Sequence, residues 1–138
     1  MPMLKVMSKA LVIGLAMIGP AMAQDRILIA SDWGEVTANL ADNDAARSLV
    51  QMLPLTIDMR DHLRQEKTGT LPAPLSEVER QRDFATGTLG LWGPDDFVIY
   101  YRDGHVPLPG IVILGHVTGD VSILDRPGSI TVRLERIK

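Results

Sequence analysis

The chain has 138 residues, with 14 basic and 17 acidic side chains and a formal net charge of −3. Nucleic acids and anionic membrane surfaces bind concentrated positive charge, whereas the basic residues here are scattered singly, so neither is an expected partner. The sequence contains no cysteine, so the fold must be held by packing rather than by disulfides.

The first 23 residues have the pattern of a secretory signal peptide. Lys5 and Lys9 precede or begin an apolar stretch over residues 10–19, and Ala21-Met22-Ala23 is typical of a cleavage site. The apolar stretch is well short of the roughly 20 residues that a membrane-spanning helix needs, so we expect cleavage and not anchoring. Cleavage after Ala23 would leave one domain, residues 24–138, free of the membrane in the periplasm or outside the cell.

The domain begins with a predicted hairpin. Residues 26–30 are rich in β-branched and aliphatic side chains, residues 31–34 have turn chemistry, and residues 35–40 alternate polar with apolar. A helix is expected next, because apolar residues recur at helical spacing over residues 45–53 behind capping residues at 42–44. Pro54 should end this helix, since the residue before a proline is pushed out of the α region.

After Pro54 the hydrophobic period changes from helical to alternating. Leu55, Ile57 and Met59 share one face, which predicts a half-buried strand over residues 55–60, and residues 66–70 could form the next strand. Residues 71–83 contain two prolines and many charges. Because proline cannot donate to a sheet ladder, we expect a surface excursion there that could include a helical turn.

The rest of the chain again has the pattern of strands. They are expected over residues 86–92, 97–101, 111–117 and 130–135, with turns at 93–96, 102–105 and 125–128. Residues 121–124 fit either a helical turn or a strand. Seven or eight short strands with one clear helix indicate a barrel or a sandwich, and we favour a closed barrel whose terminal strands are adjacent. Glycines at 87, 90, 110 and 115 would relieve crowding where strands bend.

Six short stretches along the domain carry a resemblance. They are Leu40-Ala41-Asp42-Asn43, Leu53-Pro54-Leu55-Thr56, Glu66-Lys67, Gly90-Leu91-Trp92-Gly93-Pro94, Tyr100-Tyr101 and Leu114-Gly115-His116-Val117. In this order they resemble the bacterial cyclophilin-like fold family. The resemblance covers nearly all of residues 24–138. It implies a mainly β protein: a closed barrel of about eight strands, one or two capping helices and a groove on one face.

The resemblance does not extend to the motif of the active isomerases. Catalytically active cyclophilins carry an Arg-x-x-x-x-Phe-Met-x-Gln-x-Gly-Asp stretch, in which the arginine polarises the prolyl amide. Here only Gly119-Asp120 repeats the final dipeptide. The catalytic residues are therefore unassigned. A peptidyl-prolyl isomerase with an unconventional site, with Arg60 in the polarising role, remains the alternative to a binding module.

Five residues are candidate ligand contacts: Arg60, Glu66, Lys67, Trp92 and Tyr100. Glu66 and Lys67 are neighbours on a predicted strand, so alternation should send one side chain toward the groove and the other away. An ion pair that holds the fold is the commoner role for such residues. Arg60 could bind a carboxylate or an amide oxygen, or could pair with Asp58 or Asp61.

Aromatic residues offer a second kind of contact. Trp92 and one of the adjacent tyrosines, Tyr100 or Tyr101, could face one cavity and form a stacking platform, although ordinary core packing is the better expectation for that tyrosine.

No cofactor and no metal is expected. The three histidines have no partner at metal-ligand spacing, and the sequence has no phosphate loop, dinucleotide fingerprint or nucleophile elbow. The predicted function is therefore the binding of a small molecule or a peptide segment in a surface groove.

Overall fold

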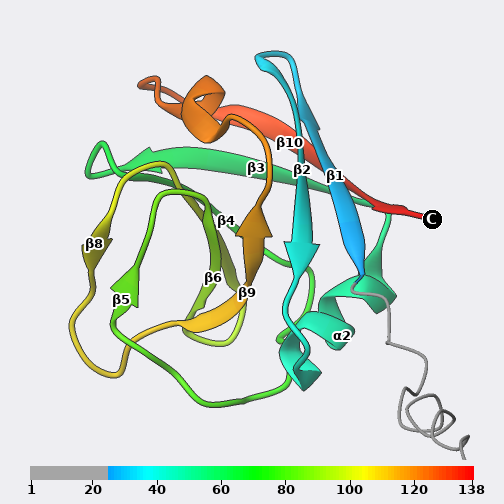
Figure 1. Ribbon diagram of the computed structural model, residues 1–138, viewed down its shortest axis with the longest axis vertical. Coiled ribbons are helices and arrows are strands. Elements are labelled where there is room, and N and C mark those ends of the chain that lie inside the picture. The colour runs from blue at the N-terminus through cyan, green and yellow to red at the C-terminus, as the bar shows by residue number, and fades with distance from the viewer. Residues whose placement is uncertain (1–24) are drawn as a thin grey trace, which may run out of the picture.

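Eight strands of the computed structural model close into an antiparallel barrel (Figure 1). In their order around the barrel they are β1 (Arg26–Ser31), β10 (Ile130–Ile137), β3 (Leu55–His62), β4 (Glu66–Thr70), β7 (Asp96–Tyr100), β6 (Thr88–Trp92), β9 (Val112–Val117) and β2 (Gly34–Leu40). The structure describes residues 25–138, so the predicted signal peptide lies outside the described residues. Among those residues, no helix is long and apolar enough to span a membrane.

The closed barrel with adjacent terminal strands is confirmed. β1 pairs with β2 on one side and with β10 on the other, and Arg26 lies opposite Ile137. Successive side chains of a strand point to opposite faces, and in β3 Ile57 and Met59 are buried inside while Asp58 and Arg60 are exposed outside. This alternation decides which side chains reach the outer face.

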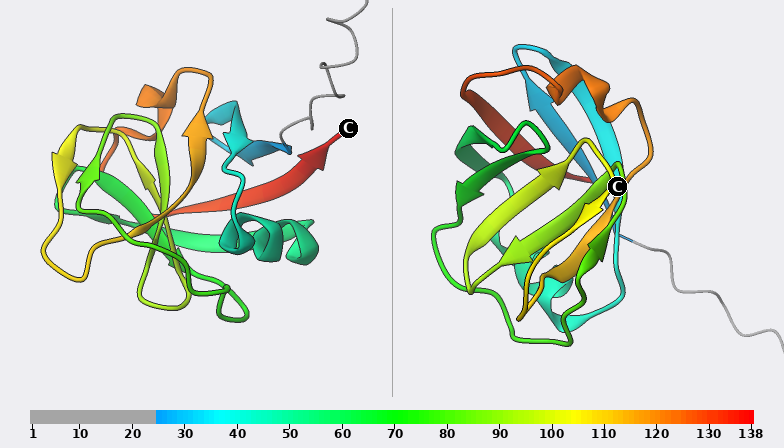
Figure 2. Two further views of the ribbon diagram at one scale, coloured as in Figure 1. Left: turned by 60° about the horizontal axis from the view of Figure 1, so that its bottom comes forward. Right: turned by 90° about the vertical axis from the view of Figure 1, so that its left-hand side faces the viewer.

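One α-helix, α2 (Asp44–Met52), follows β2 and stops before Pro54, as predicted. Asn43 caps it: its side-chain oxygen accepts from the Ala46 amide at 2.8 Å, and its Nδ2 donates to the Ile113 carbonyl at 2.9 Å. The same cap thus starts the helix and ties it to β9. Figure 2 shows the helix beside the barrel strands. Its Ala45, Ala46 and Leu49 are buried in the main core.

The helical turn considered for residues 71–83 is wrong, and the segment is not wholly a surface excursion. Leu71 and Leu75 are buried in the main core, and their amides donate to the carbonyls of Asp95 and Pro94. These two amides therefore bond to the β6–β7 loop and not to carbonyls within a helix. Arg80 holds the later part, because its guanidinium donates to backbone carbonyls, including that of Gly93 at 2.9 Å.

The turn expected over residues 102–105 also needs correction. β8 (Gly104–His105) pairs there with β5 (Asp83–Phe84) to form a separate two-stranded sheet. This small sheet covers an outer apolar cluster on the barrel wall, made of Phe84, Val98, Tyr100, Val106 and Ile111. The ambiguous residues 121–124 form a 3-10 helix, η1 (Val121–Leu124), whose Asp120 side chain accepts from the Ser122 amide.

Candidate ligand-binding face

Four of the five predicted contact residues lie on the outer face of the barrel. In the register, His62 on β3 lies opposite Glu66 on β4, and Glu66 lies opposite Tyr100 on β7. Arg60 is two residues before His62 and points to the same side, where it is exposed. Trp92, at the end of β6, packs against the outer apolar cluster.

Lys67 points the other way, into the barrel. Its side chain is 0% exposed, and Nζ donates to Asp61 Oδ1 at 2.9 Å, to the Gly128 carbonyl at 2.9 Å and to the Arg126 carbonyl. An ammonium group has three protons, so every donor is used. Nζ also lies 5.0 Å from the centroid of the Trp33 ring. The structure therefore separates Lys67 from the other four residues.

Asp61 is the centre of this polar network at one end of the barrel. Besides Lys67, it accepts from the Tyr101 hydroxyl at 2.6 Å and from Arg64 at 3.1 Å. Burial opposes ionisation of the carboxyl, but the hydrogen bonds from Tyr101, Lys67 and Arg64 outweigh it and hold its pKa below the usual range. Arg60 does not pair with Asp61, which these three residues occupy, nor with Asp58, which accepts from Thr131 at 2.9 Å.

Glu66 and Tyr100 form a buried polar pair on the outer face. Glu66 is 1% exposed and Tyr100 is 0% exposed. Glu66 Oε1 accepts from Gln65 at 2.7 Å, but Glu66 Oε2 and the Tyr100 hydroxyl have no hydrogen-bond partner among the described residues. Burial raises the pKa of Glu66, and burial followed by the Glu66 charge raises that of Tyr100. Orphaned buried polar atoms require an explanation, because such atoms are nearly always paired.

The buried carboxyl of Glu66 predicts a specific pH dependence of stability. Because its folded pKa lies above the ordinary 4.5, the wild type should lose stability as pH rises from below 4.5 through that folded pKa. Glu66→Gln removes this loss, so we expect the variant to melt several degrees higher near neutral pH, with the gain shrinking in acid. Thermal unfolding followed by circular dichroism measures both. Glu79→Gln, at an exposed position, is the control, and an equal gain in both variants would contradict the assignment.

A groove runs along the outer face of β9. One pocket of about 400 Å³ is lined by Gln81, Asp83, Phe84, Ala85, Thr88, Ile113 and His116. A second pocket of about 310 Å³ is lined by Asn39, Leu40, Ala41, Ile113, Gly115 and His116. The two pockets share Ile113 and His116 and are therefore neighbours, and together we call them the β9 groove. Its apolar surface comes from side chains such as Ile113 and Phe84, and its polar surface from others such as Asp83 and His116.

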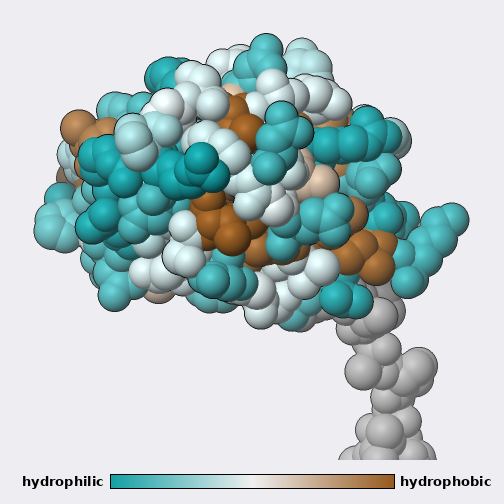
Figure 3. All heavy atoms as spheres, turned by 90° about the horizontal axis from the view of Figure 1, so that it is seen from above, coloured by the Kyte–Doolittle hydropathy of each residue, from teal (hydrophilic) through white to brown (hydrophobic). Residues whose placement is uncertain are grey.

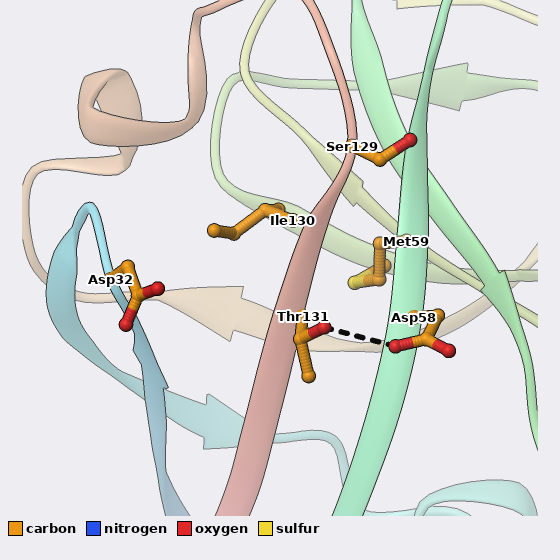
Figure 4. A pocket seen from close by; sticks show the side chains of 6 residues that line it. All are labelled: Asp32, Asp58, Met59, Ser129, Ile130 and Thr131. Carbon is orange, nitrogen blue, oxygen red and sulfur yellow. Dashed lines mark hydrogen bonds between the residues drawn. The ribbon is translucent and has the colours of Figure 1, made fainter.

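A further pocket lies on another face, between the tip of the β1–β2 hairpin and strands β3 and β10. Seen from the top of Figure 1, that side of the molecule is mainly polar, with apolar side chains between the polar ones (Figure 3). The pocket has about 310 Å³ and includes Asp32, Asp58, Ile130 and Thr131 in its lining. Figure 4 shows Asp58 bound to Thr131, with Asp32 set apart on the hairpin. With one carboxylate already hydrogen-bonded, this pocket is the weaker candidate for a ligand site.

The sequence did not indicate the β9 groove. Ile113 was recognisable only as part of a buried strand, and Phe84 lay just after the irregular segment predicted for residues 71–83. The groove depends on that segment returning beside β9, which two backbone hydrogen bonds between Gln81 and Ile111 bring about. Local pattern contains no signal for such a long-range bridge.

The eight-stranded closed barrel with one capping helix defines the class of protein. A model described as the cyclophilin-like family matches residues 29–135, and the chain belongs to this family. A search of curated proteins found no match.

Two solved structures share the fold. One is the solution structure of a hypothetical protein from Archaeoglobus fulgidus, with a TM-score of 0.65 and 17% identity; the alignment covers 87% of this chain and all of that one. The other is the crystal structure of a cyclophilin-type peptidyl-prolyl cis-trans isomerase from Cryptosporidium parvum, with a TM-score of 0.54 and 15% identity. That alignment covers 84% of this chain and 99% of the other. At these identities the likeness shows the fold alone.

Proposed function

We propose that this protein is an exported binding module that holds a small molecule or a peptide segment on the outer face of its barrel. The single observation that carries the proposal is the β9 groove, where two pockets share Ile113 and His116. Binding sites for small ligands are concave, mostly apolar and edged by a few polar groups, and pockets of this size fall at the lower end of their usual range. The signal-peptide pattern of residues 1–23 supports export.

The chemistry of the groove fits a neutral or weakly charged ligand. Ile113 is half-buried and offers apolar contact, while His116 is exposed and lies between the two pockets. The His116 ring makes no hydrogen bond to another described residue, so its ring nitrogens are available to a ligand. Arg60 is exposed on β3, four strands away from β9 in the barrel order, so the β9 groove does not include it.

Fragment and peptide titrations followed by NMR test the binding function. We expect amide shifts to cluster at Thr88, Ile113 and His116, and Ile113→Glu to weaken binding at least about tenfold by placing a charge on an apolar surface. Ser129→Ala, at an exposed position in the other pocket, is the matched control and should bind like the wild type. Shifts that cluster elsewhere, or no binding at millimolar concentration, would overturn the proposal.

Peptidyl-prolyl isomerisation is the second candidate function. One observation of this chain favours it: Arg60 is exposed on the outer face of β3 and has no ion pair to another described residue. In addition, the Cryptosporidium parvum neighbour is named as an isomerase of this type. A prolyl-peptide assay decides it. Isomerisation that is faster than background in the wild type and in Arg133→Ala, but not in Arg60→Ala, supports it. A wild-type rate equal to background rejects it.

A further inference from the structure

Phe84 separates the β9 groove from the buried polar pair Glu66 and Tyr100. It lines the larger pocket, and its ring also stacks on that of Tyr100 with the centroids 3.7 Å apart and the planes 18° apart. One ring is therefore shared between a surface open to solvent and the apolar cluster that contains Tyr100. If Phe84 moves aside, the groove extends to the Tyr100 ring.

The buried pair has two hydrogen-bonding atoms with no partner among the described residues. The Tyr100 hydroxyl can donate or accept, and the ionised Glu66 Oε2 can only accept. The two residues are directly opposite each other on β7 and β4. A group that donates one hydrogen bond and accepts another would satisfy both atoms at once.

We propose that the β9 groove binds a phenolic group, whose ring replaces Phe84 against Tyr100 and whose hydroxyl pairs with the Tyr100 hydroxyl and Glu66 Oε2. This inference rests on the proposed binding function and names the class of ligand. The stacked Phe84 and Tyr100 rings show that this face of Tyr100 accepts a flat aromatic ring. The phenol oxygen accepts from Tyr100, and the phenol proton is donated to Glu66. A phenol can arrive as a free small molecule or as a tyrosine side chain in a peptide.

The cover over Tyr100 is a small unit. β5 and β8 have two residues each, and they pair only with one another outside the barrel sheet. Gly104 provides the space in which the Phe84 ring lies, because a Cβ added there would come within 2.6 Å of Phe84 Cζ. Gly104→Ala should therefore displace Phe84 while leaving Glu66 and Tyr100 unchanged.

Titration with matched probes tests the inference on the whole domain. p-Cresol and toluene differ by one hydroxyl, and N-acetyl-tyrosinamide and N-acetyl-phenylalaninamide form the corresponding pair for a peptide source. We expect the wild type to bind the phenolic member of at least one pair about tenfold more tightly. Gly104→Ala and Phe84→Ala should both tighten phenol binding by opening the site. Tyr100→Phe, which removes only the hydroxyl, should abolish most of the preference for the phenol.

The outcomes separate this inference from the proposed function. Equal binding of the phenol and its partner, or a preference that survives in Tyr100→Phe, overturns the phenol site even when shifts at Ile113 and His116 show that the groove binds ligands. If only p-cresol binds more tightly than its partner toluene, the ligand is a free small molecule. If only N-acetyl-tyrosinamide binds more tightly than its phenylalanine partner, the ligand is a peptide. Thermal unfolding confirms that each variant is folded; Tyr100→Phe should be at least as stable as the wild type, because it deletes an unpaired buried hydroxyl.

Discussion

Asp61→Asn is expected to lower the free energy of unfolding by about 3–5 kcal/mol, the typical cost of breaking a buried ion pair by removing one partner. Asparagine keeps the shape of the side chain but not its charge. The Lys67 ammonium, 0% exposed, would then keep carbonyl acceptors but have no counter-charge. Urea unfolding followed by circular dichroism measures the loss.

The same network predicts that the protein is sensitive to acid. Because the folded pKa of Asp61 is lowered, the stabilisation that its ionised carboxyl provides is present above 3.8 and is lost as pH falls through the folded value.

The double variant Asp61→Asn/Lys67→Met is the control for this prediction. Methionine has a length similar to that of lysine and carries no charge, so the uncompensated ammonium is removed. We expect the double variant to recover a large part of the stability that Asp61→Asn loses. If the two substitutions instead add independently, the Asp61–Lys67 pair does not hold this end of the barrel.

Gly115→Ala should destabilise the barrel by about 1–3 kcal/mol, because the added methyl group has no space. A Cβ at Gly115 would lie 2.4 Å from the Asn39 carbonyl oxygen and 3.0 Å from Leu40 Cα, and both are backbone atoms that cannot rotate away. β2 and β9 are joined through only three residue pairs, which include these positions. The clash therefore falls on a short part of the barrel wall. Differential scanning calorimetry should show a lower melting temperature.

Gly119→Ala provides the matched control for the same chemical change. A Cβ at this exposed glycine would meet the Val36 side chain at 3.4 Å, an ordinary contact. We expect its stability to stay within about 0.5 kcal/mol of the wild type. If the two variants are equally destabilised, the loss comes from glycine replacement in general and not from the crowding of β2 against β9.

Much of the fold was predictable because local patterns agree with the barrel. The alternation over Leu55, Ile57 and Met59, a helix cap within residues 42–44 and the helix stop at Pro54 all act within a few residues. The structure has each of them, with Asn43 as the cap. The β5–β8 sheet was not predictable, because Phe84 and Gly104 are far apart in the sequence and pair only over the outer apolar cluster. Gly104 and His105 also have the chemistry of a turn, which hides a strand two residues long.

The candidate site was predictable only in part, for the same physical reason. Strand alternation correctly implies that Glu66 and Lys67 face opposite ways, but it does not say which of them faces the barrel interior. The structure places Lys67 inside, where Asp61 and two backbone carbonyls accept its hydrogen bonds. Glu66 Oε2 and the Tyr100 hydroxyl have no partner among the described residues because of how the strands pack in three dimensions. The sequence of a single strand does not contain that information.

The pairing of β1 with β10 also dictates when the barrel can be completed. β1 is the first described strand and β10 the last, and no other strand fills the position between β1 and β3. Until the ribosome has released the final strand, β1 and β3 each expose an unpaired edge that can pair with other chains. A chain cut short before Ile130 would lack β10 and leave those edges of β1 and β3 unpaired.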